Sequence, residues 1–181
     1  MLSEIRVATT ADIPPLRTLI EASVRALSSG YYTRAQAEGA LTHVFGIDTQ
    51  LISDRTYFLV DGATGPVAAG GWSARRTLFG GDQAKRETDS LLDPRTDAAR
   101  IRAFFVHPEW TRRGLARHLF DRCETEARDR GFRSFELVAT LPGEPLYRAL
   151  GFVTVGEVPV PLPDGLILPC IRMERPITRT A

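Results

Sequence analysis

Two long stretches of the chain carry apolar residues at the three- and four-residue spacing of an amphipathic helix. The first spans Ile13–Leu27, with Asp12 as its cap and prolines in its first turn, where proline is tolerated. The second spans Arg113–Arg130, and Gly131 ends it in a left-handed conformation. Each stretch predicts a helix with one buried face.

Shorter apolar runs predict the remaining elements. Strands are expected at 5–7, 56–60, 66–72, 100–106, 134–140, 153–160 and 167–174. Lesser helices are expected at 33–44 and 145–150, and the long polar segment 80–99 is expected to be a loop. The order β-α-α-β-β-β-α-β-α-β-β predicts a single α/β domain over residues 1–181.

Composition narrows the function classes. A formal net charge of +1 gives no electrostatic reason to expect nucleic acid or an anionic membrane as the main partner. No apolar run reaches the roughly 18 residues of a membrane span, and the start of the chain lacks a signal-peptide profile. Cys123 and Cys170 form no CxxC motif. We therefore expect a cytoplasmic protein with reduced thiols and no metal site.

The segment Val106–Arg117 carries the clearest chemistry. An apolar strand enters a tight turn, and a helix opens just after Gly114. The first turn of a helix has unpaired N–H donors and a partial positive charge, so it attracts oxyanions. Gly114 lets a phosphate approach the backbone, and Ala116 keeps the next contact small. The flanking cations are Arg112, Arg113 and Arg117. The alternative is an ordinary strand–helix connection with exposed arginines.

Together with a second motif, this loop resembles that of the GCN5-related N-acetyltransferase (GNAT) superfamily, in its bacterial form. The family loop reads R/Q-x-x-G-x-G/A, and Gly114 and Ala116 match its last two fixed positions. Thr111 departs from the first position, so a neighbouring arginine must compensate. The segment Tyr147–Phe152 matches the family ending Y-x-x-x-G-F, whereas Thr140 stands where the family often has Asn.

The resemblance implies a fold and a cosubstrate. The fold is a mixed, mostly antiparallel sheet of six or seven strands with about four helices and a splay between the fourth and fifth strands. The cosubstrate is acetyl-CoA, whose pantetheine arm would fill the splay against the backbone of Phe105, Val106 and His107. Its pyrophosphate would lie on Arg112, Arg113, Gly114, Leu115, Ala116 and Arg117. Tyr147 would face the CoA sulfur, with core packing as its alternative role.

The implied activity is that of an acyltransferase moving the acetyl group to a primary amine. The amine would attack directly in a ternary complex, since neither cysteine lies in a motif for a covalent intermediate. The acceptor, a small molecule or a peptide, is not readable from the sequence, nor is the use of acyl groups other than acetyl. Tyr31, Tyr32 and Trp72 are candidates for its walls, with packing as the alternative for the two tyrosines. Because family members are often dimers, a homodimer is compatible with the resemblance.

The general base and two other functions stay open. The strand 100–106 carries no carboxylate, Glu136 on the neighbouring strand is more typical of a solvated residue, and His107 would lie beside the cofactor arm. A water molecule is as good a candidate as these or the loop residues Glu87, Asp93 and Asp97. One alternative function is a non-catalytic acyl-CoA-binding sensor or partner module. The other is an acetyltransferase acting on tRNA or the ribosome, which the near-neutral charge disfavours.

Overall fold

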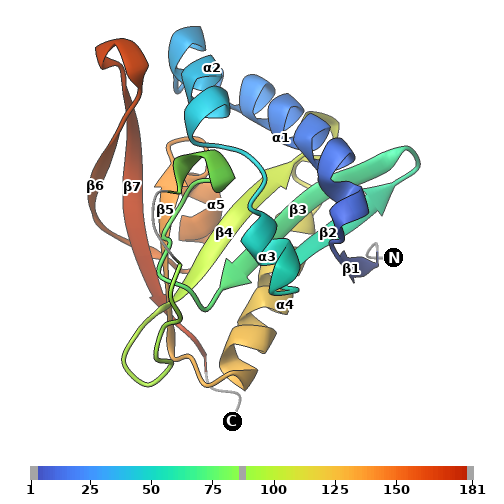
Figure 1. Ribbon diagram of the computed structural model, residues 1–181, viewed down its shortest axis with the longest axis vertical. Coiled ribbons are helices and arrows are strands. Elements are labelled where there is room, and N and C mark those ends of the chain that lie inside the picture. The colour runs from blue at the N-terminus through green and yellow to red at the C-terminus, as the bar shows by residue number, and fades with distance from the viewer. Residues whose placement is uncertain (1–3, 86–88, 179–181) are drawn as a thin grey trace.

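A computed structural model describes residues 4–85 and 89–178. Its strands are β1 (Ile5–Val7), β2 (Tyr57–Gly62), β3 (Gly65–Ser73), β4 (Ala99–Val106), β5 (Ser134–Thr140), β6 (Val153–Pro161) and β7 (Ile167–Pro176). Its α-helices are α1 (Ile13–Leu27), α2 (Arg34–His43), α3 (Thr49–Ser53), α4 (Leu115–Asp129) and α5 (Glu144–Ala149). All seven strands form one sheet in the order β1-β2-β3-β4-β5-β7-β6 (Figure 1).

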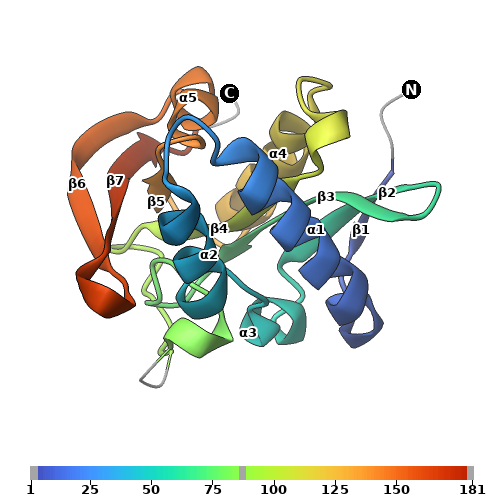
Figure 2. The ribbon, with the colours of Figure 1, turned by 90° about the horizontal axis from the view of Figure 1, so that it is seen from above.

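Helices cover both faces of the sheet, with α1, α2 and α3 on one side and α4 and α5 on the other (Figure 2). Side chains of β2 alternate between the two layers. Phe58 packs in the cluster that includes the buried face of α4, and its neighbour Tyr57 packs in the cluster that includes the buried face of α1. The two predicted amphipathic helices thus bury their apolar stripes against opposite faces of one sheet.

The sheet is interrupted between β4 and β5, its only parallel pair among the described strands. These two strands pair only at their first residues, Ala99 with Phe135 and Arg100 with Glu136. Beyond that point no further β4–β5 pairing is present in the described chain. The expected mixed α/β sheet, with a splay between its fourth and fifth strands, is confirmed.

A bulge in β4 lies beside the opening. Ala103 has a φ of 55°, and the pairing of β4 with β3 shifts register between Ala69 and Gly71. A bulge of this kind bends its strand and interrupts the regular ladder. From the α1 side of the sheet, the buried Tyr57 Oη donates to the Ala103 carbonyl oxygen at 3.2 Å. The bulge is therefore held from within the core.

Two features of the first half differ from the predictions. The described chain has five α-helices rather than about four, because α3 is only five residues long and too short to show a periodicity. Asp48 starts this helix by accepting a hydrogen bond from Gln50 N at 3.1 Å. The segment expected as a polar loop contains a 3-10 turn, Asp82–Ala84. Just before this turn lie residues 77–81, which we call the strap.

Candidate active site

A cavity of about 740 Å³ lies in the gap between β4 and β5. On the α4 side its walls come from the loop before α4, from the start of α4 and from α5. On the α1 side they come from α1, the end of α2 and the strap. The cavity therefore reaches both faces of the sheet through the splay. We call six of its α1-side residues the apolar wall: Val24, Leu27, Tyr31, Phe45, Leu78 and Phe79.

The loop before α4 builds an anion site from backbone. Gly114 is the N-cap of α4 with a φ of 79°, and it supplies no side-chain cap. Arg112 is also left-handed, with a φ of 62°. Turns of this kind gather consecutive N–H groups into a concave site for anions. A Cβ placed on Gly114 would meet nothing within 4 Å, so the space in front of the helix is open to a ligand. This geometry fits a pyrophosphate.

The three arginines of the loop have different surroundings. Arg112 and Arg117 line the cavity, and Arg117 Nη2 donates to the Ala149 carbonyl oxygen at 3.1 Å. Arg113 lies outside the lining, because its guanidinium stacks over Trp110 at 4.6 Å from the ring centroid. Arg112 and Arg117 are therefore the loop cations placed to contact a phosphate in the cavity. Arg113, which was expected to contact the phosphate as well, does not line the cavity.

The edge of β4 supplies two of the three backbone positions expected to meet pantetheine. Phe105 and Val106 line the cavity, whereas His107 does not. His107 N donates to the Val67 carbonyl oxygen on β3 at 2.8 Å, so its N–H faces away from the splay. Because N–H directions alternate along a strand, that of Val106 points to the open edge. There it donates to Ser23 Oγ of α1 at 3.3 Å.

Tyr147 lies on α5 and lines the cavity. Its ring meets Phe104 and Phe152 edge-on, with centroids 6.3 and 5.8 Å apart. Burial raises the pKa of Tyr147, so the phenol stays protonated and acts as a hydrogen-bond donor. Within residues 4–85 and 89–178 its hydroxyl makes no hydrogen bond. Thr140, which stands at the family's Asn position, accepts from Gly143 N at 3.2 Å and closes the turn before α5.

Two of the three predicted acceptor contacts are wrong. Trp72 is fully buried, packs edge-on against Phe132 and does not line the cavity. Tyr32 is also buried, and its hydroxyl donates to the Pro169 carbonyl oxygen at 2.6 Å and accepts from Leu141 N at 2.9 Å. Both side chains pack in the core. Tyr31 lines the cavity and is half exposed, so its predicted contact stays open.

The named carboxylates do not reach the cavity. Glu136 pairs with Arg100 and Arg172 at the closed end of the splay. Asp93 pairs with exposed Arg95. Asp97 accepts a hydrogen bond from Asp93 N, and Glu87 lies outside the described residues. Among the described lining residues there is no Asp, Glu or His at all. The side chains described here supply no general base.

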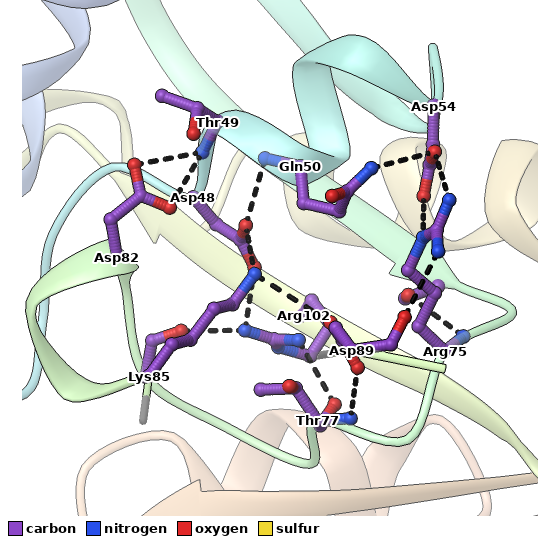
Figure 3. Close-up of polar contacts among 12 residues, drawn as sticks. Asp48, Thr49, Gln50, Asp54, Arg75, Thr77, Asp82, Lys85, Asp89 and Arg102 are labelled. Atoms are coloured by element: carbon purple, nitrogen blue, oxygen red, sulfur yellow. Dashed lines mark hydrogen bonds and ion pairs between the residues drawn. The ribbon is translucent and has the colours of Figure 1, made fainter. Parts of the chain in front are cut away.

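A buried ionic network that the sequence did not predict lies behind the strap (Figure 3). Arg102, on β4 beside the bulge, is 3% exposed. It donates to Asp48 Oδ2 at 2.8 Å and to the carbonyl oxygens of Thr77 and Gly80 at 2.9 and 2.5 Å. Lys85 Nζ donates to Asp48 Oδ1 at 2.5 Å. This network fastens the strap to β4. The available signal was a pair of arginines, Arg100 and Arg102, in an otherwise apolar strand.

The described residues contain no group of three or more His, Cys, Asp or Glu side chains that could hold a metal ion. Over the same ranges, none of the helices combines the length and the apolar character that crossing a membrane requires.

Comparisons with known proteins agree with this geometry. Residues 89–161 match the family model of the acetyltransferase (GNAT) domain. A GCN5-related N-acetyltransferase from Rhodopseudomonas palustris superimposes with a TM-score of 0.71 at 17% identity, covering 97% of this chain and 96% of that one. No curated protein is similar enough in sequence to count as a match.

Two further similar structures were solved with coenzyme A or acetyl-CoA bound. An N-acetyltransferase from Thermoplasma acidophilum in complex with coenzyme A has a TM-score of 0.66 at 12% identity, covering 97% of this chain and 99% of that one. A phosphinothricin acetyltransferase from Sinorhizobium meliloti in complex with acetyl-CoA has a TM-score of 0.60 at 21% identity, covering 98% and 89%. Residues 89–161 thus resemble the acetyltransferase (GNAT) domain, and the chain has the fold of the GCN5-related N-acetyltransferases.

Proposed function

We propose that this protein is an acetyl-CoA-dependent N-acetyltransferase that acetylates a primary amine. The observation that carries the proposal is the cavity through the splay. It connects the anion site at the start of α4 to the apolar wall on the other face of the sheet. A cosubstrate with a phosphate-bearing arm and an acceptor can therefore meet in the gap from opposite sides.

The residues present fit acetyl-CoA, which would supply an activated acetyl group as a thioester. The open first turn of α4, with Arg112 and Arg117, would hold the pyrophosphate. The exposed edge of β4 from Phe104 to Val106 would align the pantetheine arm. Its outward N–H groups can also donate hydrogen bonds to the thioester carbonyl oxygen as negative charge develops there.

The transfer requires one nucleophile and one leaving group. The amine nitrogen forms a bond to the acetyl carbon as the C–S bond breaks. The sulfur leaves with the electron pair and takes up a proton, while the nitrogen loses its proton to water. A thiol of pKa about 8.5 is a stronger acid than a phenol of about 10, and burial raises the pKa of Tyr147 further. We therefore assign Tyr147 a hydrogen bond to the departing sulfur rather than full proton transfer.

An amine suits this cavity better than a hydroxyl does. A hydroxyl nucleophile needs a base to remove its proton, and no Asp, Glu or His lines the described cavity. A neutral amine already carries a reactive lone pair. The acceptor we propose is a small molecule or peptide that carries such an amine. The formal net charge of +1 disfavours a nucleic acid as the acceptor.

Calorimetric titration with acetyl-CoA tests the cosubstrate, with 3′-dephospho-CoA and NAD as comparison ligands. We expect saturable binding of acetyl-CoA and none of NAD. Gly114→Val should weaken acetyl-CoA binding at least about tenfold, because the side chain enters the open space before α4. Gly165→Val is the matched control, since Gly165 has a φ of 73° and equally open space but lies at the β6–β7 turn.

Two results would change the assignment. If neither acetyl-CoA nor 3′-dephospho-CoA binds, the loop is not a CoA site. If acetyl-CoA binds but a broad set of primary amines releases no CoA thiol, the protein is a non-catalytic acyl-CoA-binding module.

A further inference from the structure

The apolar wall presents hydrocarbon to the α1 side of the cavity. Its residues come from α1 and the connection after it, from the end of α2 and from the strap. Phe45 meets Phe105 of β4 edge-on, with ring centroids 6.4 Å apart, so the wall continues up to the strand that faces the splay. An acceptor that reaches this strand must pass along aromatic and aliphatic surface.

The charged side chains of the network behind the strap bind one another. Arg102 lines the cavity, but its guanidinium donates to Asp48 and to two strap carbonyl oxygens. Asp48 accepts from Arg102 and from Lys85, and its side chain is 1% exposed. Figure 3 shows these groups facing one another. The network therefore builds the strap and leaves no charge for a ligand.

The other polar groups of the α1 side are neutral. Ser23 and Ser28 line the cavity, and Ser23 Oγ accepts from Val106 N. The remaining lining cations, Arg112 and Arg117, belong to the loop before α4. No carboxylate is found among the described lining residues. An ammonium group that left water for this part of the cavity would find no anionic partner among the lining residues that the structure describes.

This chemistry selects the form of the acceptor. A charge that is buried without a partner is strongly disfavoured, so an amine enters such a site in its neutral form. A lysine-like amine of pKa about 10.4 is neutral in only about one molecule in 2,500 at pH 7. On the basis of the proposed function, we infer that the acceptor is a weakly basic amine on an aromatic or branched aliphatic body, bound uncharged against the apolar wall.

Two isomeric amines give a direct test. Para-toluidine is neutral at pH 7, whereas benzylamine is protonated, and both have the same atoms. We titrate each into CoA-saturated protein by calorimetry, and repeat both titrations without CoA. Para-toluidine should bind at least about tenfold more tightly. Equal or tighter binding of benzylamine, for example through a cation–π contact with the wall, would overturn the inference.

The pH dependence of turnover gives a second, independent readout. Below the pKa of benzylamine, its apparent KM should fall about tenfold for each unit of rising pH, while kcat stays level. A site that binds the ammonium form would show a level KM and a rising kcat, which would contradict the inference.

A pair of variants locates the preference. Tyr31→Glu places a carboxylate on the wall at a half-exposed position and should reduce the preference for para-toluidine about tenfold. Leu91→Glu makes the same change of charge at a position 66% exposed and outside the cavity lining, and should leave the preference unchanged. An unchanged preference in Tyr31→Glu would show that the wall does not set it.

Failure of the proposed function looks different from failure of this inference. If para-toluidine binds preferentially but no member of the broad set of primary amines releases CoA thiol, the inference about the site holds and the transferase assignment fails. If both amines are acetylated with benzylamine preferred in binding, the transferase assignment holds and the inference fails.

Discussion

At the scale of single residues, the cavity combines a few residues to which the proposed function assigns a role with many that only fill space. Gly114 and Tyr147 belong to the first kind. The left-handed conformation of Gly114 and the open space before it leave room for an anion to approach the backbone. Tyr147 is set by the aromatic rings around it, so its hydroxyl is the one polar atom of that side chain left to act.

Tyr147→Phe should lower kcat about tenfold or more, because the departing sulfur loses a hydrogen-bond donor. The Kd for acetyl-CoA should stay within about twofold, since the ring packing is kept. Steady-state kinetics and calorimetry measure the two quantities. Tyr32→Phe is the control: its hydroxyl is bound to β7 and the end of β5, so kcat should be unaffected. Wild-type kcat in Tyr147→Phe would leave Tyr147 as a packing residue.

The positions of some cavity residues could be predicted from the sequence, because their type and spacing match a known motif. Gly114, Ala116 and Tyr147 line the cavity as predicted from motif positions, although only experiment tests their roles. Prediction failed where residue type alone was the signal. Trp72 and Tyr32 are aromatic because they fill the core, and an aromatic residue in a sequence carries no mark of which side of a strand or helix it occupies.

At the scale of elements, the strap is joined to β4 by hydrogen bonds from Arg102 to two strap carbonyl oxygens, and Asp48 neutralises that arginine. Removing the carboxylate of Asp48 leaves Arg102 buried without its ion-pair partner and leaves Lys85 with Asp89 alone. We expect Asp48→Asn to lower the free energy of unfolding by about 3–5 kcal/mol, measured by urea denaturation at pH 7. Asp93→Asn breaks a solvent-exposed pair with Arg95 and should cost far less, because solvent screens such a pair. Similar losses in both variants would mean that the network does not hold the strap.

Most elements could be predicted from their periodicity, and the misses have a physical cause. The bounds of β5 and of α1 agree with the prediction. The predicted capping of α1 by Asp12 is wrong, because its carboxylate accepts hydrogen bonds from Thr9 and Arg6 rather than from the first turn of the helix. Helix α3 and the strap were missed because their conformations depend on distant partners. Asp48 caps α3 and at the same time binds Arg102, 54 residues along the chain. No local pattern reports such a contact.

At the scale of the whole molecule, an ion cluster ties the edge of the sheet to the α1 layer. Arg6 of β1 donates to Asp12, just before α1, at 2.7 Å and to Asp61 of β2 at 2.5 Å. The hydrogen bond from Arg6 lowers the pKa of Asp12 from its usual 3.8 to about 2. A carboxyl group whose pKa is lower in the folded state stabilises the fold above its unfolded pKa, and that contribution is lost as the pH falls through the folded pKa.

Asp12→Asn should therefore lower the free energy of unfolding at neutral pH and leave it unchanged at low pH, where Asp12 is protonated in the wild type. Because Arg6 is partly solvated, we expect a loss of about 1 kcal/mol at pH 6. The difference from the wild type should shrink as the pH falls from about 4 to 2. Urea denaturation across this range measures it, with Asp121→Asn as the control, an exposed carboxylate without an ion pair in the described residues. A difference that stays constant with pH would contradict the assignment.

The overall architecture could be predicted only with the help of the family resemblance. Hairpins and helices followed from local patterns, but the position of the splay came from the resemblance and was then confirmed by the β4–β5 pairing. The apolar wall could not be predicted, because its six residues come from three separate segments of the chain. Their common environment exists only once the strap is fastened to β4.

The splay has a kinetic consequence for the proposed reaction. Because the cavity reaches both faces of the sheet, the two substrates have separate entrances, and neither must pass the other to reach the gap. Access alone then imposes no compulsory order of addition. The same holds for departure: CoA can leave by the side of α4 while the acetylated product leaves along α1, so neither product traps the other.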